Sequence, residues 1–383
     1  MSGPLAGIRV LELPNIGPVQ FAGMLLADMG ADVLRLDRSS DVATGSSVAG
    51  FVSPYSVIDR GRRSAGIDLK HPDAAEVVLR CAEAADVLLE GFRPGVAERL
   101  GIGPDVCRAR NDRLVYARMT GWGQDGPLAG DVGHDINYLS LAGVLFHIGP
   151  AGGPPVPPIN LLADFGGGGS LVVMGILAAL VERASSGRGQ VVDAAMVDGS
   201  AQLMSIFFGI DAMGGWSDRG SNLLDGGAHF YNVYATADGA YVSIAAYEPK
   251  FYANLLRLLA LDDLDPAQQM DRAQWPILKA RLAEIFAMRT RDEWVAFFAG
   301  SEVCFAPVLS MSEARAHQHN VARRTFVDVD GAPQPAPAPR FDRTPSAVTR
   351  APVAAGTDTD TALTDWGFSG DEVARLKASG ALS

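Results

Sequence analysis

Two neighbouring residues of this sequence could transfer a proton to and from carbon. His134 and Asp135 stand side by side in GHDINYLSLAG, where a loop meets the start of a predicted helix. Backbone N–H groups at a helix start favour negative charge. A histidine there could remove a carbon-bound proton while these N–H groups hold the enolate oxygen that forms. A lone histidine is nevertheless more often structural, and Asp135 could serve only as a cap or in the first helical turn.

Two further carboxylates stand at the boundaries of predicted elements. Asp164, in NLLADFGGGGS, precedes a glycine run and a predicted helix, so its first interpretation is a helix N-cap. The alternative is that the glycines let a ligand approach the backbone, with the carboxylate beside it. Glu248, in AAYEPKFY, ends a predicted strand just before Pro249, where a carboxylate usually caps a helix or lies in a solvated turn.

A glycine pattern at 121–126, GWGQDG, follows a predicted strand and fits G-x-G-x-x-G. A dinucleotide site would also need an amphipathic helix directly after it and an acidic residue at a second strand end. Pro127 and further glycine follow instead. A tight turn that needs positive φ is therefore favoured, and an NAD-dependent dehydrogenase is disfavoured.

The amino-acid composition limits the kinds of molecule that this protein is expected to bind. The chain has 383 residues, 48% of them hydrophobic, which is ample for a packed core. Its net charge of −12 argues against nucleic acid as the main partner, although a local basic cluster could still hold a small anion. The three cysteines fit neither a zinc pattern nor a disulfide framework, so no metal site is expected.

Targeting signals are not recognisable. The N-terminal MSGPLAGIRV lacks the features of a signal peptide, and the terminal SGALS is not the peroxisomal S-K-L. The longest apolar run, near 171–181, is expected to be too short to span a bilayer. A soluble cytoplasmic protein is therefore expected.

The first third of the chain alternates short Val-, Leu- and Ile-rich runs with segments of helical period. This alternation predicts βαβ units and a parallel sheet, which binds ligands at the carboxyl ends of its strands. Strands are expected at 8–13, 31–37, 64–69, 85–92 and 114–120, and helices at about 18–29, 72–84 and 94–110.

The remainder of the chain predicts a second, smaller α+β domain. A hairpin over 231–246 turns at Asp238-Gly239, and Ser369 with Glu372 fits a capping box. A mobile loop is expected over 39–58, a helix from Leu171 to the glycine stop at Gly187 and Gly189, helices at about 249–260, 275–288 and 290–299, a strand in VCFAPVLS, and an extended linker over 331–341. The expected organisation is a large domain over 1–200, a linker over 201–224, a small domain over 225–330, and a proline-rich linker with a C-terminal segment over 331–383.

Eight segments of the chain resemble, in the same order, the class III CoA-transferase (CaiB/BaiF) family. They are IRVLEL, ADVLRLDR, SAGIDLK, ADVLLEGFRPGVAERLG, NDRLVYARMTGWGQDGP, GHDINYLSLAG, DFGGGG and GQVVDAAMVDG. The resemblance spans nearly the whole chain. The GHDINY form, with histidine before aspartate, is similar to the α-methylacyl-CoA racemase branch of that family.

The resemblance implies an α/β fold with a Rossmann-like large domain that binds CoA rather than NAD, a small α+β domain, and an interlocked homodimer with shared active sites. The implied reaction is a 1,1-proton transfer at C2 of a 2-methylacyl-CoA thioester. His134 and Asp164 would be the acid/base pair on opposite faces of an enolate. The backbone N–H of Asp135 would meet the thioester oxygen, and Glu248 of the partner subunit would orient His134. No metal or redox cofactor is implied.

Candidate binding residues come both from cations at or just after the ends of the predicted strands and from the resemblance. Arg38, Arg62, Arg63, Lys70, Arg93 and Arg99 are cationic candidates for the CoA phosphates, although any one of them could be a solvated surface residue. DRGRR at 59–63 departs from the family pattern, so contacts of Arg62 and Arg63 stay open. The residues that the resemblance places against CoA or substrate are Arg38, Ile67, Asp68, Leu69, Lys70, Gly91, Phe92, Arg93, Arg99, Gly133, Ile136, Asn137, Tyr138, Asn160 and Tyr231. Met196, Met204, Phe207, Phe208 and Met213 could hold the acyl tail but are better explained as core or dimer-interface residues.

Two other functions are weighed against racemisation. In a CoA-transferase the aspartate at the position of Asp135 is the acyl-accepting nucleophile. A non-catalytic CoA-binding protein could keep the same fold. The joint presence of His134, Asp164 and Glu248 favours the racemase over both.

Overall fold

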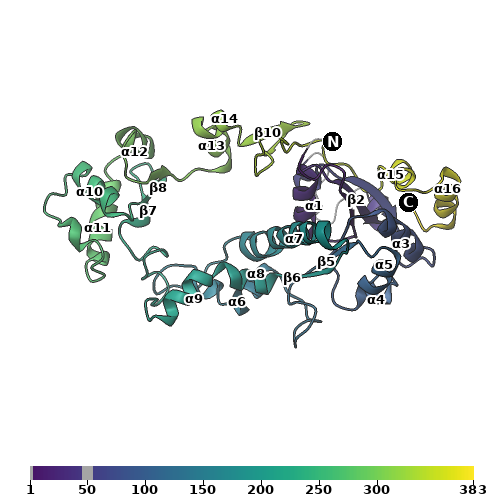
Figure 1. The fold of residues 1–383 in the computed structure, drawn as a ribbon. Coiled ribbons are helices and arrows are strands. Elements are labelled where there is room, and N and C mark those ends of the chain that lie inside the picture. Colours follow the sequence, from purple (N-terminus) through teal and green to yellow (C-terminus); the bar gives the residue numbers. More distant parts are fainter. Residues whose placement is uncertain (1–2, 45–54) are drawn as a thin grey trace. The chain divides into compact units, whose positions relative to one another are not determined.

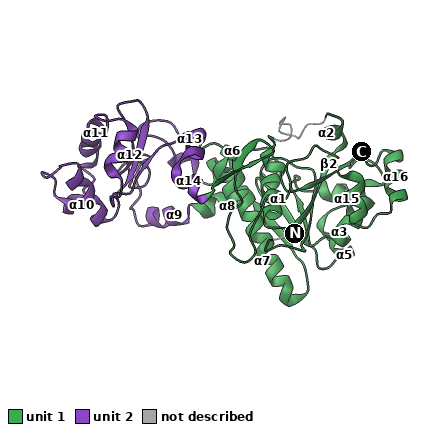
Figure 2. Cartoon of the chain, turned by 90° about the horizontal axis from the view of Figure 1, so that it is seen from above, with its two compact units in different colours: residues 1–142, 158–203, 324–383 green, residues 143–157, 204–323 purple. Residues whose placement is uncertain are grey.

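The computed structural model of this chain describes residues 3–44 and 55–383 (Figure 1). It separates into two compact units, which Figure 2 colours differently. Unit 1 comprises Met1–Ala142, Pro158–Leu203 and Arg324–Ser383, and unit 2 comprises Gly143–Pro157 and Met204–Arg323. Part of the segment expected in the large domain, residues 143–157, therefore groups with unit 2.

Unit 1 is built on a six-stranded parallel sheet of order β3-β2-β1-β4-β5-β6. This is the strand order of a Rossmann-like doubly wound fold, which confirms the predicted α/β class. The strands are β1 Arg9–Glu12, β2 Asp32–Arg38, β3 Arg63–Ile67, β4 Val87–Glu90, β5 Val115–Thr120 and β6 Val191–Ala195. The first five were predicted and β6 was not, because this edge strand is short and two of its five residues are exposed.

Helices cover both faces of this sheet. Helices α1 (Pro18–Asp28) and α7 (Leu171–Ser186) lie on one side in Figure 1, and α3 (Ala74–Ala84) lies on the other. The single helix expected over 94–110 is wrong. It is split into α4 (Val96–Arg99) and α5 (Pro104–Arg110), because Gly101 has a φ of 73° that ends the first and Pro104 begins the second.

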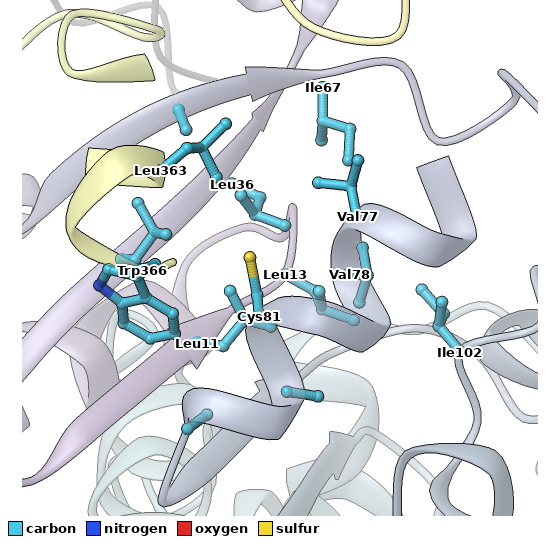
Figure 3. Close-up of a cluster of buried hydrophobic side chains, with 14 of the residues drawn as sticks. Leu11, Leu13, Leu36, Ile67, Val77, Val78, Cys81, Ile102, Leu363 and Trp366 are labelled. Atoms are coloured by element: carbon cyan, nitrogen blue, oxygen red, sulfur yellow. The ribbon is translucent and has the colours of Figure 1, made fainter. Parts of the chain in front are cut away.

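The C-terminal segment completes the core of unit 1. Helices α15 (Thr359–Asp365) and α16 (Gly370–Ser379) pack beside α3, and the predicted capping box at Ser369 is confirmed. Figure 3 shows apolar side chains from the sheet, α3 and the C-terminal segment meeting in one cluster. Its labelled members are Leu11, Leu13, Leu36, Ile67, Val77, Val78, Cys81, Ile102, Leu363 and Trp366.

Two segments expected to lack regular structure contain it. The prediction of a mobile loop over 39–58 is wrong at both ends, where α2 (Ser39–Thr44) and a 3-10 turn, η1 (Val57–Asp59), are formed. Positions 45–54 of the predicted loop lie outside the described residues. The extended linker at 331–341 begins as a hairpin, since β10 (Phe326–Val329) pairs with β11 (Ala332–Pro335). Prolines are tolerated there because both strands are edge strands.

A π-helix, η3 (Leu161–Ser170), runs directly into α7, which ends at Gly187 as predicted. Together they form a helical stretch of 26 residues that contains an 18-residue window with a mean hydropathy of 1.7, long and apolar enough to cross a membrane by length and composition alone. The expectation that this apolar run is too short is therefore wrong. Within unit 1, however, α7 packs on β5, β6 and α1, which gives its apolar residues a structural reason.

Unit 2 contains the predicted hairpin, extended by a third strand. Strands β7 (Tyr231–Ala235), β8 (Tyr241–Ala245) and β9 (Phe305–Pro307) are antiparallel neighbours. The predicted helices are confirmed as α10 (Pro249–Leu258), α11 (Trp275–Phe286) and α12 (Arg291–Phe298). Unit 2 also holds α9 (Ser205–Ala212), α13 (Met311–Ala316), α14 (Gln318–Arg323) and the short turns η2 (Leu145–His147) and η4 (Pro266–Gln268).

The apolar candidates for the acyl tail do not share one environment. Met196, in α8 (Met196–Leu203), is buried as expected of a core residue. Helix α9 has no buried residue, and Phe208 and Met213 are 54% and 80% exposed. The core interpretation is therefore wrong for these two residues within this chain, whereas the interface interpretation stays a prediction.

Candidate active site

The candidate site is a cavity of about 440 Å³ in unit 1, at the carboxyl ends of β1, β4 and β5. This is the edge where a doubly wound sheet binds its ligands. His134 and Asp164 both line this cavity. The lining residues are 15–19, 91–94, 119–122, 129, 131–134, 138, 164 and 196.

His134 is held by its backbone at the start of helix α6 (Asp135–Leu141). It takes the N-cap position with extended dihedrals, φ −134° and ψ 175°, and its N–H donates to the Asn137 carboxamide oxygen at 3.0 Å. The imidazole is exposed along the cavity wall. A base at this position lies on the cavity wall, with the first N–H groups of α6 beside it.

Asp164 lies inside the first turn of η3, so the N-cap interpretation is wrong and Asn160 takes that position. The Asn160 carboxamide donates to the Asp164 carboxylate at 3.1 Å. Burial raises the pKa of Asp164, the Asn160 hydrogen bond opposes this, Asp135 adds to the rise, and His134 counteracts it. A carboxyl with a raised pKa is better able to give and take a proton near neutral pH.

The Asp135 side chain does not line the cavity. It is 3% exposed, and its Oδ2 accepts hydrogen bonds from the backbone N–H groups of Ala163 at 2.8 Å and Asp164 at 2.9 Å. Asp135 thus occupies the first turn of α6 while its carboxylate caps the first turn of η3.

Tyr138 closes one side of the cavity. Its hydroxyl donates to the Gly133 carbonyl, and its ring meets the ring of Trp122 edge-on, with centroids 4.8 Å apart. Burial, reinforced by the Asp164 charge, raises the pKa of Tyr138 to about 12. A Cβ on Gly121 would lie 2.2 Å from the Tyr138 ring, so glycine is required there.

The glycine pattern at 121–126 is a turn, as predicted. Gly123 and Gly126 have φ of 95° and 89°, which favour glycine. The glycine run after Asp164 does not open the backbone to a ligand, so that interpretation is wrong. A Cβ on Gly168 would lie 2.8 Å from Met196 of α8, and one on Gly169 would lie 2.8 Å from the Pro18 carbonyl of α1. These glycines let three helices pack closely.

Arg62 and Arg63, whose phosphate contacts the sequence leaves open, both form ion pairs within the fold. Arg62 is fully buried and bonds to Glu12 at 2.5 Å and to Asp59 at 2.6 Å. Arg63 bridges Asp32 at 2.8 Å and Asp365 at 2.7 Å. The buried Arg62 guanidinium cannot reach a phosphate without breaking its ion pairs, whereas the Arg63 side chain is 20% exposed and its ion pairs lie near the surface.

The other predicted CoA contacts follow the strand ends. Arg38 ends β2 opposite Ile67 of β3, residues 68–70 follow β3, and residues 91–93 follow β4, all at the same edge of the sheet. Gly91, Phe92, Arg93 and Gly133 line the cavity, whereas Arg38, Asp68, Leu69, Lys70, Arg99, Ile136 and Asn137 do not. The Ile67 side chain is buried in the core and is not available to a ligand.

Glu248 and Tyr231 belong to unit 2. Glu248 is the exposed N-cap residue of α10 and its side chain makes no capping hydrogen bond. Tyr231 pairs with Ala245 across the β7–β8 ladder. Both residues belong to a different unit from His134, so their roles stay predictions.

Two parts of the cavity lining were not predicted from the sequence: the segment that follows β1, and the residue Trp122. Residues 15–19 line the cavity from the loop that joins β1 to α1. The signal that could have identified them is their position after the first strand, where doubly wound folds bind their ligands. Among residues 3–44 and 55–383, no group of three or more His, Cys, Asp or Glu side chains is placed to hold a metal ion.

Comparison with known proteins gives the same class as the fold and the cavity. The CoA-transferase family III model matches residues 5–359, and the chain belongs to this family. Among curated relatives, the α-methylacyl-CoA racemase of Mus musculus is 46% identical over 97% of this chain and 96% of that protein. The α-methylacyl-CoA racemase of Homo sapiens is 42% identical over 98% and 96%.

Solved structures agree in fold. A CAIB/BAIF family protein from Brucella suis superimposes with a TM-score of 0.81 at 25% identity, covering 96% of this chain and 100% of that one. Rv3272 from M. tuberculosis superimposes with a TM-score of 0.78 at 28% identity, covering 94% and 99%. The family also includes CoA-transferases, such as the human succinyl-CoA:glutarate CoA-transferase, which is 25% identical over 93% of this chain and 84% of that protein.

Proposed function

We propose that this protein interconverts the (2R) and (2S) forms of 2-methylacyl-CoA thioesters. The observation that carries the proposal is that an imidazole, His134, and a carboxyl, Asp164, line one cavity from the starts of two different helices. Two acid/base groups around one carbon are what inversion at that carbon requires. The racemases that are 42% and 46% identical over nearly the whole chain support the same activity.

In the proposed reaction one group removes the C2 proton and the other returns a proton to the opposite face of the planar enolate. The backbone N–H of Asp135, in the first turn of α6, would stabilise the enolate oxygen. The raised pKa of Asp164 suits a carboxyl that must act as a base in one direction and an acid in the other. A thioester already acidifies its α-proton, so the proposed chemistry needs no further cofactor.

The alternative CoA-transferase reaction needs a carboxylate oxygen of Asp135 to attack the acyl carbon. The Asp135 side chain is 3% exposed and one of its oxygens holds two backbone N–H groups. Attack would require these hydrogen bonds to break and the turn to open. This favours the racemase over the transferase, and the proton-transferring pair favours it over a non-catalytic CoA-binding protein.

We further propose that the active protein is a cytoplasmic homodimer in which Glu248 of the partner subunit orients His134. Support comes from the exposed position of Glu248 and from helix α9, whose Ile206 and Phe208 are 64% and 54% exposed. Apolar side chains exposed to that extent along one helix favour burial against another chain. Sedimentation of the intact protein with and without Glu248→Ala would measure the oligomeric state.

The direct test is isotope exchange without an acceptor acid. One epimer of a 2-methylacyl-CoA is incubated with the protein in deuterated water, and deuterium at C2 and epimer composition are followed together. The proposal predicts one deuterium at C2 and formation of the other epimer, above a protein-free control. Transfer of CoA to an added carboxylic acid, with C2 left unexchanged, would establish the transferase instead.

A further inference from the structure

We infer that the Asp135 side chain is a positioning residue that sets the placement of Asp164 relative to His134. This inference rests on the proposed function for its catalytic meaning, but its structural part can be tested independently. Asp135 is covalently joined to His134 and is hydrogen-bonded, through its carboxylate, to the backbone of Asp164. One residue therefore connects the two acid/base groups.

The Asp135 carboxylate binds the first turn of η3, where backbone N–H groups lack acceptors within the helix. The first N–H groups of any helix lack partners within that helix. Asn160, the N-cap residue of η3, makes no side-chain capping hydrogen bond, and its carboxamide donates to Asp164 instead. The Asp135 carboxylate supplies the missing acceptor from another helix, to the N–H groups of Ala163 and Asp164. Its negative charge also suits the positive end of a helix.

The geometry of η3 adds a second reason for an external cap. Ile159, two residues before the π-helix, has a φ of 59°, a conformation that a β-branched residue rarely adopts. The π-helix is itself an uncommon form that occurs mostly at functional sites. A backbone entered through such a residue needs tertiary contacts to hold it, and Asp135 provides two hydrogen bonds.

The surroundings of the Asp135 carboxylate hold this side chain in one position. Asp135 is 3% exposed, and its other oxygen, Oδ1, is buried without a hydrogen-bond partner among the described residues. A carboxylate in that setting is anchored by its two backbone donors and cannot turn toward the cavity without leaving them unpaired. The groups that act electrostatically with Asp164 are Asp135, His134 and Tyr138.

The test compares Asp135→Ala with Asp135→Asn, which keeps an acceptor oxygen but removes the charge. Hydrogen exchange of the Ala163 and Asp164 amides, measured by NMR, reports the cap directly and needs no substrate. We expect both amides to exchange faster in Asp135→Ala than in the wild type, with Asp135→Asn between them. Asp125→Ala, an exposed carboxylate of the preceding loop, is the matched control.

Epimerisation kinetics supply the second readout. Small misplacements of a catalytic group can cost about 100-fold in rate, so we expect Asp135→Ala to lose about 100-fold in kcat with little change in KM. Asp135→Asn should lose less than about tenfold. In both variants the acid limb of the pH profile should move to lower pH, because the Asp135 charge no longer raises the pKa of Asp164.

Two results would overturn the inference. Unchanged exchange of both amides in folded Asp135→Ala would show that the carboxylate caps nothing. An Asp135→Asn variant as slow as Asp135→Ala, with wild-type circular dichroism in both, would show that the acceptor does not matter. A wild-type protein that racemises nothing would refute the proposed function while leaving the amide-exchange test intact.

Discussion

The Asn160 carboxamide donates a hydrogen bond of 3.1 Å to the Asp164 carboxylate one turn later in the same helical segment. The bond favours the ionised carboxylate and so lowers the pKa of Asp164 against the larger effect of burial, which raises it. Burial and the Asn160 hydrogen bond therefore shift the pKa of Asp164 in opposite directions. The effect of Asn160 can be removed by substitution.

Replacing Asn160 with alanine is expected to raise the pKa of Asp164. Asp164 is needed in its ionised form to accept a proton, so the acid limb of the pH profile should move to higher pH. The loss of kcat at neutral pH should be smaller than the ~100-fold or greater loss expected for Asp164→Ala. The profile of kcat against pH for α-proton exchange measures both, and an acid limb that stays in place or moves to lower pH would contradict the assignment.

Arg62 is expected to stabilise the fold rather than bind CoA. Removing one partner of a buried ion pair costs about 3–5 kcal/mol, and Arg62→Met leaves Glu12 buried without its cation. Denaturant unfolding should show a loss of that size, and Glu12→Met/Arg62→Met should recover part of it. CoA affinity of the folded fraction should be unchanged. A drop in CoA affinity without loss of stability would restore Arg62 as a phosphate ligand.

Gly121→Ala is expected to destabilise the protein, because the new Cβ would lie 2.2 Å from the Tyr138 ring. Overpacking of this kind typically costs about 1–3 kcal/mol. Gly130→Ala is the matched control, since a Cβ there meets nothing within 4 Å. Unfolding free energies of the two variants make the comparison, and equal stability would mean that Tyr138 is not fixed against this loop.

Unit 2 is expected to lose stability in acid through His229. This histidine is 1% exposed, its Nε2 lies 2.8 Å from the Tyr252 hydroxyl, and burial, with a smaller effect of Lys279, lowers its pKa to about 4. The unfolded chain takes up the proton at about 6.5, so stability should fall by up to about 3 kcal/mol as pH drops from 6.5 to 4. Above pH 6.5 His229 should contribute no pH dependence.

The comparison variant is His229→Gln, which can still hydrogen-bond to Tyr252 but does not titrate. Its unfolding free energy should change less between pH 6.5 and 4 than that of the wild type. Parallel curves for the two proteins would exclude His229 as the group responsible.

The sheet of unit 1 was predictable because its inner strands are short apolar runs separated by helical spacers. Strand β6 was not, because VVDAA is a five-residue run at the edge of the sheet that Asp193 interrupts and in which two positions are exposed. The split of the helix expected over 94–110 depends on backbone geometry at Gly101, which an apolar pattern does not show. The Asp238-Gly239 turn was recognisable from its residue types, and it correctly marked where β7 ends and β8 begins.

The site was predictable in part, through residue types at the ends of predicted elements. His134 could be placed at a helix start from sequence alone. The position of Asp164 could not, because the π-helix that carries it is held by a carboxylate 29 residues earlier in the chain. The role of Arg62 could not be inferred either, because its partner Glu12 lies 50 residues earlier in the chain and meets it only in the folded protein.

The most direct test of the two-base account is α-proton exchange by single variants, started separately from each epimer. His134→Ala should exchange only the epimer that presents its proton to Asp164, and Asp164→Ala only the opposite one, and neither should invert its substrate at the wild-type rate. If both variants exchange the same epimer, or if either still interconverts the two epimers as the wild type does, His134 and Asp164 do not act on opposite faces of one carbon.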